Sequence, residues 1–330
     1  MATLKDVAEK ANVDTSTVSR ALNNTSYVHP ETKKRIIEAA KSLGYHPNIV
    51  AQSLRNGRRN TIAFIVPRIA DALYSDMVPA ISDEARKLDY QCILCITDDD
   101  EKTEKEILER LRNGVVDGII ISSSGKNNRL LRDIDAEGIP VLQAVRKQDD
   151  RLSSIVTDYY KNGYNAVMYL YSRGCRHLGL IIGNLALHPY MERYNGFLKA
   201  LKEAGIDGIT AMDDEEPMSF NYGLVCTNKL FEKNSNIDGV LASLDIQGLG
   251  AQRALKLMGK KIPDDVKLIS LTGISLGGYL ETTMTSMEVP ANEMGREAVN
   301  MLIRDISVKG DKRPVKHTVY SSTLVEREST

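Results

Sequence analysis

Residues 3–22 read TLKDVAEKANVDTSTVSRAL, and this stretch decides the fold of the N-terminal part of the chain. Its apolar residues recur three and four positions apart, as they do on one side of an α-helix. Thr3 and Asp6 have the spacing of a capping box at a helix start. Asn12 tolerates the left-handed conformation that ends a helix, and Asp14 can cap the start of another. The pattern therefore predicts two short helices joined by a tight turn.

The second of these helices would bury its apolar side and leave a polar side on or near the surface, formed by Thr15, Ser16, Thr17, Ser19 and Arg20. Two helices joined in this way form a helix-turn-helix unit, whose second helix lies in the DNA major groove. Arg20 could donate two hydrogen bonds to guanine O6 and N7, and Thr15 and Ser16 could contact bases through hydroxyl or methyl groups. An ordinary helical hairpin with a solvated face is the alternative at this point.

The sequence that follows predicts a third helix and a basic connector. Pro30 can occupy the first position of a helix that Gly44 ends. A weak helix of about two turns is expected at 49–56, and it should be marginal in isolation because helix nucleation is costly. Residues 1–60 hold ten Lys and Arg against five Asp and Glu, whereas the remaining residues hold 33 against 39. A basic head of this kind is the electrostatic footprint of phosphate binding.

Four segments carry a resemblance: LKDVA at 4–8, TVSRALN at 17–23, GYHPN at 44–48 and AQSLR at 51–55. Together they resemble the headpiece and hinge of the LacI/GalR family of bacterial transcription regulators. In that family the hinge helices of two subunits pair in the minor groove of a palindromic operator, and a leucine wedges between base steps. The resemblance implies a homodimer that binds double-stranded operator DNA. Its candidate DNA contacts are Thr3, Thr15, Ser16, Thr17, Arg20, His29, Ala51, Leu54 and Arg55.

Length and composition indicate a cytoplasmic protein of two or three domains. With 330 residues, of which 42% are hydrophobic, the chain can bury substantial cores. No apolar run approaches the roughly eighteen residues of a membrane span, and the N-terminus lacks the apolar segment of a signal peptide. The four cysteines are scattered and fit reduced thiols. We therefore expect no membrane partner.

From residue 61 onward, short apolar runs alternate with helical patterns. The predicted strands are 61–66, 91–97, 118–122, 140–144, 178–183, 239–242 and 267–272. The predicted helices are 75–88, 102–113, 129–137, 162–172, 190–204, 219–231 and 245–258. This alternation predicts parallel sheets that are covered by helices on both faces. A further helix at 291–308 and a last strand near 315–324 exceed what a second lobe alone would need.

The body resembles the periplasmic sugar-binding-protein fold that the LacI/GalR family carries. The fold class is therefore an all-α helix-turn-helix headpiece followed by an α/β two-lobe body, with chain crossings near 157–159, 287–290 and 317–320. The expected parts are a headpiece at 1–47, a hinge and linker at 48–60, a first lobe at 61–158 plus 290–317, and a second lobe at 159–289 plus 318–330. Ligands of open parallel sheets lie beyond the carboxyl ends of the strands, so we expect the effector site between the lobes.

The resemblance also gives candidate effector contacts, namely Leu73, Tyr74, Arg146, Asp158, Arg193, Asp245 and Thr272. Arg193 begins RYNGF at 193–197, which matches the family's Arg-x-x-Gly-Phe/Tyr, whose arginine usually reaches the ligand with two donors. Thr272 and Gly273 stand where the family has carboxylates. Because two arginines and few acids remain, the sequence predicts a sugar or sugar derivative and favours an anionic one. A solvated or lobe-bridging ion pair is the alternative role for such strand-end charges.

Other chemistry has weaker support in the sequence. GISLG at 273–277 matches the Gly-x-Ser-x-Gly turn of serine hydrolases, but a poor helix start follows it and the one downstream histidine, His317, lies at an expected crossover. Cys92 and Cys95 lie three apart in a predicted strand and so face opposite sides, which argues against a shared metal. The acidic run 98–101 fits a helix N-terminus better than a calcium loop. We expect no catalytic residue, metal or cofactor, and the alternative function is that of a ligand-binding protein acting without DNA.

Overall fold

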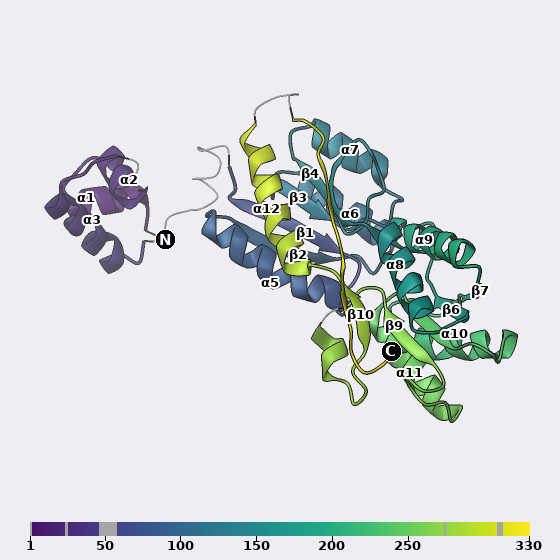
Figure 1. Cartoon of the computed structure of the whole chain (residues 1–330). Helices are drawn as coiled ribbons and strands as arrows, with labels where there is room; N and C mark the ends of the chain where they lie inside the picture. Colours follow the sequence, from purple (N-terminus) through teal and green to yellow (C-terminus); the bar gives the residue numbers. More distant parts are fainter. Residues whose placement is uncertain (1, 24–25, 46–57, 274, 309–312) are drawn as a thin grey trace. The chain divides into compact units, whose positions relative to one another are not determined.

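The structure, a computed structural model, describes residues 2–23, 26–45, 58–273, 275–308 and 313–330. The chain divides into two compact units, Met1–Arg59 and Asn60–Thr330 (Figure 1). The expected hinge helix at 49–56 lies outside the described residues, and so do its candidate DNA contacts Ala51, Leu54 and Arg55.

The described part of the first unit contains the helices α1 (Leu4–Ala11), α2 (Thr15–Asn23) and α3 (Pro30–Ser42). The predicted capping box is present, because Thr3 Oγ1 accepts from the Asp6 N–H at 3.3 Å and Asp6 Oδ2 accepts from the Thr3 N–H at 2.7 Å. Asn12 follows α1 with a φ of 50°, in the left-handed region. The predicted helix, turn and helix are therefore confirmed.

Gly44 ends α3 as predicted, with a φ of 59°. The N–H of Tyr45 donates to the Ala40 carbonyl at 2.9 Å, and the N–H of Gly44 donates to the Lys41 carbonyl at 3.1 Å. This pair of bonds is a Schellman motif, which satisfies the last carbonyls of the helix. The three helices enclose a small core of buried side chains that comprises Val7, Ala8, Ala11, Val18, Ala21, Ile36, Ala39 and Ala40.

Within the described residues, the body contains two six-stranded sheets. The first has the order β11-β5-β4-β3-β1-β2 with all strands parallel. Its strands are β1 (Thr61–Val66), β2 (Gln91–Ile96), β3 (Gly118–Ile121), β4 (Val141–Ala144), β5 (Ser153–Thr157) and β11 (His317–Tyr320). Its helices are α5 (Ala72–Lys87), α6 (Glu101–Arg112), α7 (Asn128–Ala136) and α12 (Ala291–Ser307), of which α12 packs against α5 (Figure 1).

Strand β1 illustrates why the sequence of this sheet is so apolar. Ile62, Phe64 and Val66 belong to a core that α5 and α12 cover. Ala63 and Ile65 belong to the core on the opposite face, which α6 and α7 cover. A strand that is buried on both faces needs apolar residues at every position, so the prediction from continuous apolar runs is confirmed for this strand.

The second sheet has the order β12-β10-β9-β8-β6-β7, and its edge strand β12 runs antiparallel to β10. Its strands are β6 (His177–Ile181), β7 (Asp207–Ala211), β8 (Gly239–Ala242), β9 (Lys267–Ser270), β10 (Thr285–Glu288) and β12 (Thr323–Val325). The helices that accompany it are α8 (Tyr159–Ser172), α9 (His188–Ala204), α10 (Phe220–Lys233), α11 (Asp245–Leu257) and the short 3-10 helix η1 (Ser275–Tyr279). The chain passes between the sheets after β5, after β10 and after β11.

Some predicted elements were wrong in place or number. Strands β5, β7 and β10 were not predicted, because their sequences SSIVT, DGITA and TSME contain polar residues or glycine and form no apolar run. The last predicted strand is in fact two, β11 and β12, one in each sheet. Helix α5 begins at Ala72 rather than at 75, so Leu73 and Tyr74 lie in its first turn and not in a loop.

Candidate functional site

The exposed face of α2 is the candidate DNA surface of the headpiece. Thr15, Ser16 and Arg20 are exposed and Thr17 is half-buried, and the Arg20 guanidinium donates to Ser16 Oγ at 3.3 Å. Ser19 corrects the prediction, because only 8% of it is exposed. It borders the apolar stripe of the helix closely enough to be covered. The remaining side chains offer hydroxyl groups and a two-donor guanidinium to a partner.

Two further candidates, Thr3 and His29, occupy the residues before α1 and α3, and both are exposed. The first backbone N–H groups of a helix have no partner within the helix, and the helix dipole favours negative charge there. Helix starts of this kind suit phosphate groups. The structure thus places six of the predicted DNA contacts at surfaces with the appropriate chemistry.

In the body, an open pocket with about 360 Å³ of empty space, adjoining solvent included, is lined by loops and helix starts that follow strands of both sheets. A second hollow of about 400 Å³ shares Asp71, Leu73, Met218, Leu244 and Thr272 with it. Six of the seven predicted effector contacts line these two spaces, namely Leu73, Tyr74, Arg146, Arg193, Asp245 and Thr272. We refer to the two spaces together as the cleft pocket.

Asp158 is the predicted contact that is absent from the described lining of the cleft pocket. It caps α8, where its Oδ1 accepts from the Lys161 N–H at 3.0 Å, and its Oδ2 lies 3.3 Å from Lys161 Nζ. The next residue, Tyr159, lines the pocket instead and donates from its hydroxyl to the Val145 carbonyl at 3.0 Å. Asp158 therefore acts here through the start of α8, and direct contact with an effector stays a prediction.

Arg193 is buried and ties the ends of several elements together. Its Nε donates to Asn162 Oδ1 at 3.0 Å, and its Nη1 donates to the Ser243 carbonyl at 3.1 Å. Its Nη2 donates to the Leu271 carbonyl at 2.7 Å and to Thr272 Oγ1 at 3.1 Å. Because a guanidinium has five N–H donors, these four bonds leave one free for a ligand in this arrangement.

Arg146 reaches the cleft pocket through a strained turn. Val145 has a φ of 67°, which is rare for a β-branched residue, and the Arg146 N–H donates to the Ala144 carbonyl at 2.7 Å. These features define a γ-turn of the strained type. Backbone strain persists where the surrounding structure demands a particular placement. Here the turn places Arg146, a residue that is only 3% exposed, in the pocket wall.

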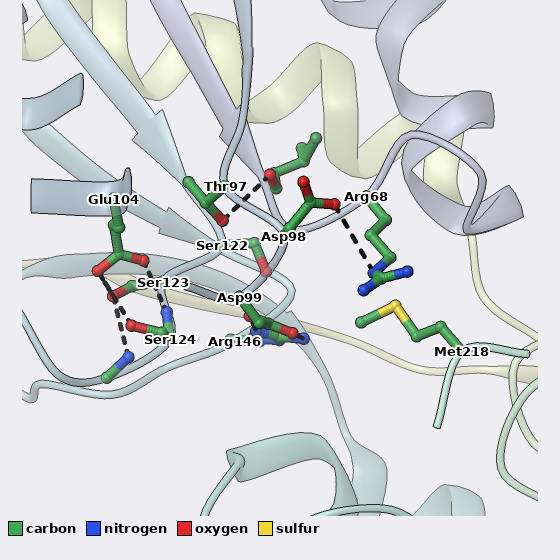
Figure 2. A network of polar contacts seen from close by, with 12 residues as sticks. Arg68, Thr97, Asp98, Asp99, Glu104, Ser122, Ser123, Ser124, Arg146 and Met218 are labelled. Carbon is green, nitrogen blue, oxygen red and sulfur yellow. Dashed lines mark hydrogen bonds and ion pairs between the residues drawn. The ribbon is translucent and has the colours of Figure 1, made fainter. Parts of the chain in front are cut away.

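The partner of Arg146 is Asp99, whose two carboxylate oxygens accept from Nη1 and Nη2, the latter at 2.9 Å (Figure 2). The neighbouring Asp98 faces Arg68, with 3.9 Å between Oδ1 and Nε. Both aspartates have positive φ, 53° and 56°, and they precede the helix. The prediction of an acidic helix start is therefore wrong for these two residues. It is confirmed for Asp100, which caps α6 by accepting from the Thr103 N–H at 2.7 Å.

A buried carboxylate organises the loop after β3. Glu104 of α6 is 0% exposed and accepts from Ser123 Oγ at 3.0 Å, from the Ser124 N–H at 2.8 Å and from Asn127 Nδ2 at 2.9 Å (Figure 2). A buried charge is tolerated only when it is satisfied in this way. Ser122 of the same loop shares a hydrogen bond of 2.6 Å with the hydroxyl of Tyr74. The network thereby holds one wall of the cleft pocket.

Asp71 is a lining residue that the sequence analysis missed. It caps α5 by accepting from the Leu73 N–H at 3.0 Å. Burial raises its pKa to about 6, and Asp245 adds to this, while the Leu73 N–H, Arg146 and Arg193 act in the opposite direction. An aspartate before a helical pattern is a capping signal, but Asp71 lies too far from a helix start at 75 to act as its cap, whereas the observed helix begins at Ala72. The premise that the pocket has few acids was therefore wrong.

One ion pair links the two lobes at residues that the sequence analysis did not single out. Arg68, after β1, donates from Nη2 to Glu216 Oε2 at 2.7 Å. The other oxygen of Glu216 accepts from the N–H of Met218 at 3.3 Å, and Met218 lines the cleft pocket. The lobe-bridging ion pair named above as an alternative thus exists here, between different residues.

Other candidate chemistry finds little geometric support. Ser275 begins the short helix η1, and His317 lies in β11 with its Nδ1 2.8 Å from Ser154 Oγ. Cys92 and Cys95 pack against cores on opposite faces of the first sheet, as predicted. In the part of the chain that the structure describes, no three His, Cys, Asp or Glu side chains are grouped as metal ligands. No described helix has both the length and the apolar character that a bilayer crossing requires.

Family models match both units of the chain. Residues 3–48 match the model described as bacterial regulatory proteins, lacI family, and residues 167–330 match the periplasmic binding protein-like domain. The ribose operon repressor of Halalkalibacterium halodurans is 30% identical over 332 residues, which cover 100% of this chain and 97% of that protein. The HTH-type transcriptional regulator RegA of Clostridium saccharobutylicum is 33% identical over 329 residues, covering 99% and 98%.

Solved structures agree with this assignment. The transcriptional regulator CelR in complex with cellobiose superposes with a TM-score of 0.75 at 26% identity and covers 100% of both chains. The lac repressor dimer bound to operator and the anti-inducer ONPF has the same fold, with a TM-score of 0.88 at 23% identity over 99% of this chain and 98% of that one. The chain therefore belongs to the lacI family of bacterial regulatory proteins and is a transcription regulator with an effector-binding body, not an enzyme.

Proposed function

We propose that this regulator is a repressor that binds a palindromic operator as a homodimer, and that a small neutral ligand with several hydroxyl groups controls its affinity for DNA. One observation carries the proposal: the cleft pocket takes its walls from both lobes of a body that follows a helix-turn-helix headpiece. A ligand held by both walls changes the equilibrium between lobe arrangements. In a dimer, a change in the lobe arrangement can change how the two headpieces bind DNA.

In this proposal the headpiece, residues 1–47, reads the duplex. Arg20 recognises a guanine, while Thr15, Ser16 and Thr17 contact neighbouring bases or phosphates. Thr3 and His29 approach the phosphate backbone, which fixes the register of the protein on DNA without reading sequence. The hinge and linker at 48–60 supply Ala51, Leu54 and Arg55 to the minor groove. Such binding places the protein in the cytoplasm, where bacterial DNA lies.

The proposed lobes are 61–158 plus 290–317 and 159–289 plus 318–330. The strand order of the two sheets supports this division except at 318–320, because β11 (His317–Tyr320) pairs with β5 in the first sheet. The ligand alters the relative placement of the lobes, and this shift changes how two hinges pair. Because binding energies are linked reciprocally, operator must change the affinity for ligand by the same factor as ligand changes the affinity for operator.

The chemistry of the cleft pocket supports a neutral ligand over the anionic one favoured by the sequence. Asp71 and Asp245 line it, Arg193 is largely occupied by protein groups, and Arg146 is paired with Asp99. Tyr159 and Tyr190 add aromatic surface of the kind that pockets use beside a few polar groups. The ribose repressor and the cellobiose complex among the similar proteins point to carbohydrates as the class to try first.

The proposal is tested by an electrophoretic mobility shift of the full chain on genomic fragments, with and without a panel of carbohydrates. We expect selective retardation of a few fragments that contain a palindrome. Leu54→Ala should weaken operator binding more than binding to random DNA, and Arg20→Ala should relax the preference for one base. Equal losses on operator and random DNA for both variants would contradict the assignment and favour a ligand-binding protein that acts without DNA.

A further inference from the structure

The pair formed by Arg146 and Asp99 has a geometry that bears on which ligands the cleft pocket accepts. Both nitrogens at the end of the guanidinium donate to the two oxygens of one carboxylate. This fork is also the arrangement by which arginine binds a carboxylate or phosphate of a ligand. Asp99 therefore occupies the donors that an anionic ligand would use.

The other charges of the cleft pocket do not replace those donors. Arg146 and Arg193 are the cationic side chains among its described lining residues, and Arg193 has four of its N–H groups bonded to protein acceptors. Asp71 and Asp245 contribute two carboxyl groups to the same walls. An anion would face these carboxyl groups without a free guanidinium fork to offset them.

The turn that carries Asp99 is built for this placement. Asp98 and Asp99 both have positive φ, at 53° and 56°, and positive φ at consecutive non-glycine residues is costly. Val145, beside Arg146, is also in the left-handed region. Two strained turns, one after β2 and one after β4, thus bring the carboxylate and the guanidinium together (Figure 2). The Asp99 side chain is 31% exposed, whereas that of Arg146 is 4% exposed.

We propose that Asp99 is a specificity-determining residue that neutralises Arg146 and thereby makes the cleft pocket select neutral hydroxyl-bearing ligands against anionic ligands of similar shape. This inference rests on the proposed function, since it concerns the same pocket. Asp99 acts through Arg146 and need not touch the ligand. Removing its charge should expose the guanidinium fork and turn the pocket into an anion site.

The test compares Asp99→Asn with the wild type, using inorganic phosphate as the probe in thermal-shift and calorimetric titrations. We expect the Asp99→Asn protein to bind phosphate at least tenfold more tightly than the wild type. The matched control is Asp98→Asn, which removes the same charge from the adjacent residue, whose partner Arg68 is not among the described lining residues. This control should bind phosphate as weakly as the wild type.

A second variant identifies the route of the effect. In the double variant Asp99→Asn with Arg146→Gln, the gained phosphate binding should be lost, because the fork itself is gone. Ribose and ribose 5-phosphate then give the same comparison on one sugar. Only the Asp99→Asn protein should shift its binding preference toward the phosphorylated form. Wild-type phosphate binding equal to that of Asp99→Asn, or an equal gain in Asp98→Asn, would overturn the inference.

Operator binding is measured on the same samples by mobility shift. If the wild type fails to recognise any duplex, the proposed function fails, whereas the phosphate comparison still decides the role of Asp99. If operator binding is intact and Asp99→Asn gains no phosphate affinity, the inference about Asp99 fails by itself. Retained operator binding by the variants also shows that they are folded.

Discussion

Replacing Arg193 with methionine tests whether this arginine holds the cleft pocket together before any ligand arrives. In Arg193→Met, four hydrogen bonds of a buried guanidinium are lost. Two of the acceptors keep another donor, since the Leu271 carbonyl also accepts from Asn162 Nδ2 at 2.9 Å and the Ser243 carbonyl accepts from Thr272 Oγ1 at 2.7 Å. Asn162 Oδ1 loses its hydrogen bond from the arginine. The loss of stability should therefore come mainly from this one acceptor and from the missing positive charge.

The magnitude follows from these bonds. A buried polar group that loses its partner costs about 1–3 kcal/mol and more when the partner is charged, so we expect the free energy of unfolding to fall by about 3 kcal/mol. Removing a buried charge gives some stability back, but Asp71 and Asp245 then lose a cation that favours their ionised forms. In domains of about 150–250 residues, 1 kcal/mol moves the Tm by about 2–4 °C, so the expected drop is about 6–12 °C.

The assay is thermal unfolding of the ligand-free protein followed by calorimetry. Arg112→Met is the matched control, because its side chain is 36% exposed and pairs with Glu137 at the surface. Exposed pairs contribute about 0–1 kcal/mol, so the Tm of this control should fall by no more than about 4 °C. Equal shifts for the two variants would refute the reasoning that Arg193 is a structural tie.

Three more predictions concern the walls of the cleft pocket. Since burial raises the pKa of Asp71 to about 6, affinity for a hydroxyl-bearing ligand that donates to its carboxylate should fall as the pH drops below about 6, and Asp71→Asn should flatten that profile in calorimetric titrations. Glu104→Ala should lower the free energy of unfolding by about 3–5 kcal/mol in denaturant titrations, because buried and part-buried neutral donors lose their acceptor at about 1–3 kcal/mol each; a loss below about 1 kcal/mol would contradict this. Glu216→Gln should change the lobe equilibrium, and so the ligand affinity, by a factor of about 2–5, because the ion pair with Arg68 is part-exposed; an unchanged affinity would count against a lobe-bridging role.

The sequence predicted the parts of the fold whose causes are local. The capping box at Thr3 and Asp6 and the Gly44 helix end each depend on a few adjacent residues, and both are present. The apolar run 61–66 gave the exact bounds of a strand, because a strand buried on both faces must be apolar throughout. Strand β7 was not predicted for the opposite reason. It is a half-exposed strand at the edge of its sheet, and such a strand needs no continuous apolar run.

The sequence predicted most of the candidate contacts that line the cleft pocket, but it did not predict the balance between positive and negative charges there. Arg146 and Arg193 could be assigned by resemblance, and both line the pocket. The partner of Arg146 lies 47 residues away, on a turn whose positive φ values no local pattern announces. Asp71 depended on where α5 begins, and an error of three residues there hid a carboxyl group. The charge balance of the pocket therefore depends on a contact between residues far apart in the sequence, which local patterns do not reveal.

A single titration decides most about this protein: the affinity of the full chain for a palindromic operator, measured by fluorescence anisotropy at moderate ionic strength, with and without a ligand that occupies the cleft pocket. We predict clear preference for the palindrome over a scrambled duplex and a change of at least tenfold in that affinity when ligand is added. Equal affinity for the two duplexes, under every carbohydrate tried, would contradict the view that this body controls a DNA-reading headpiece.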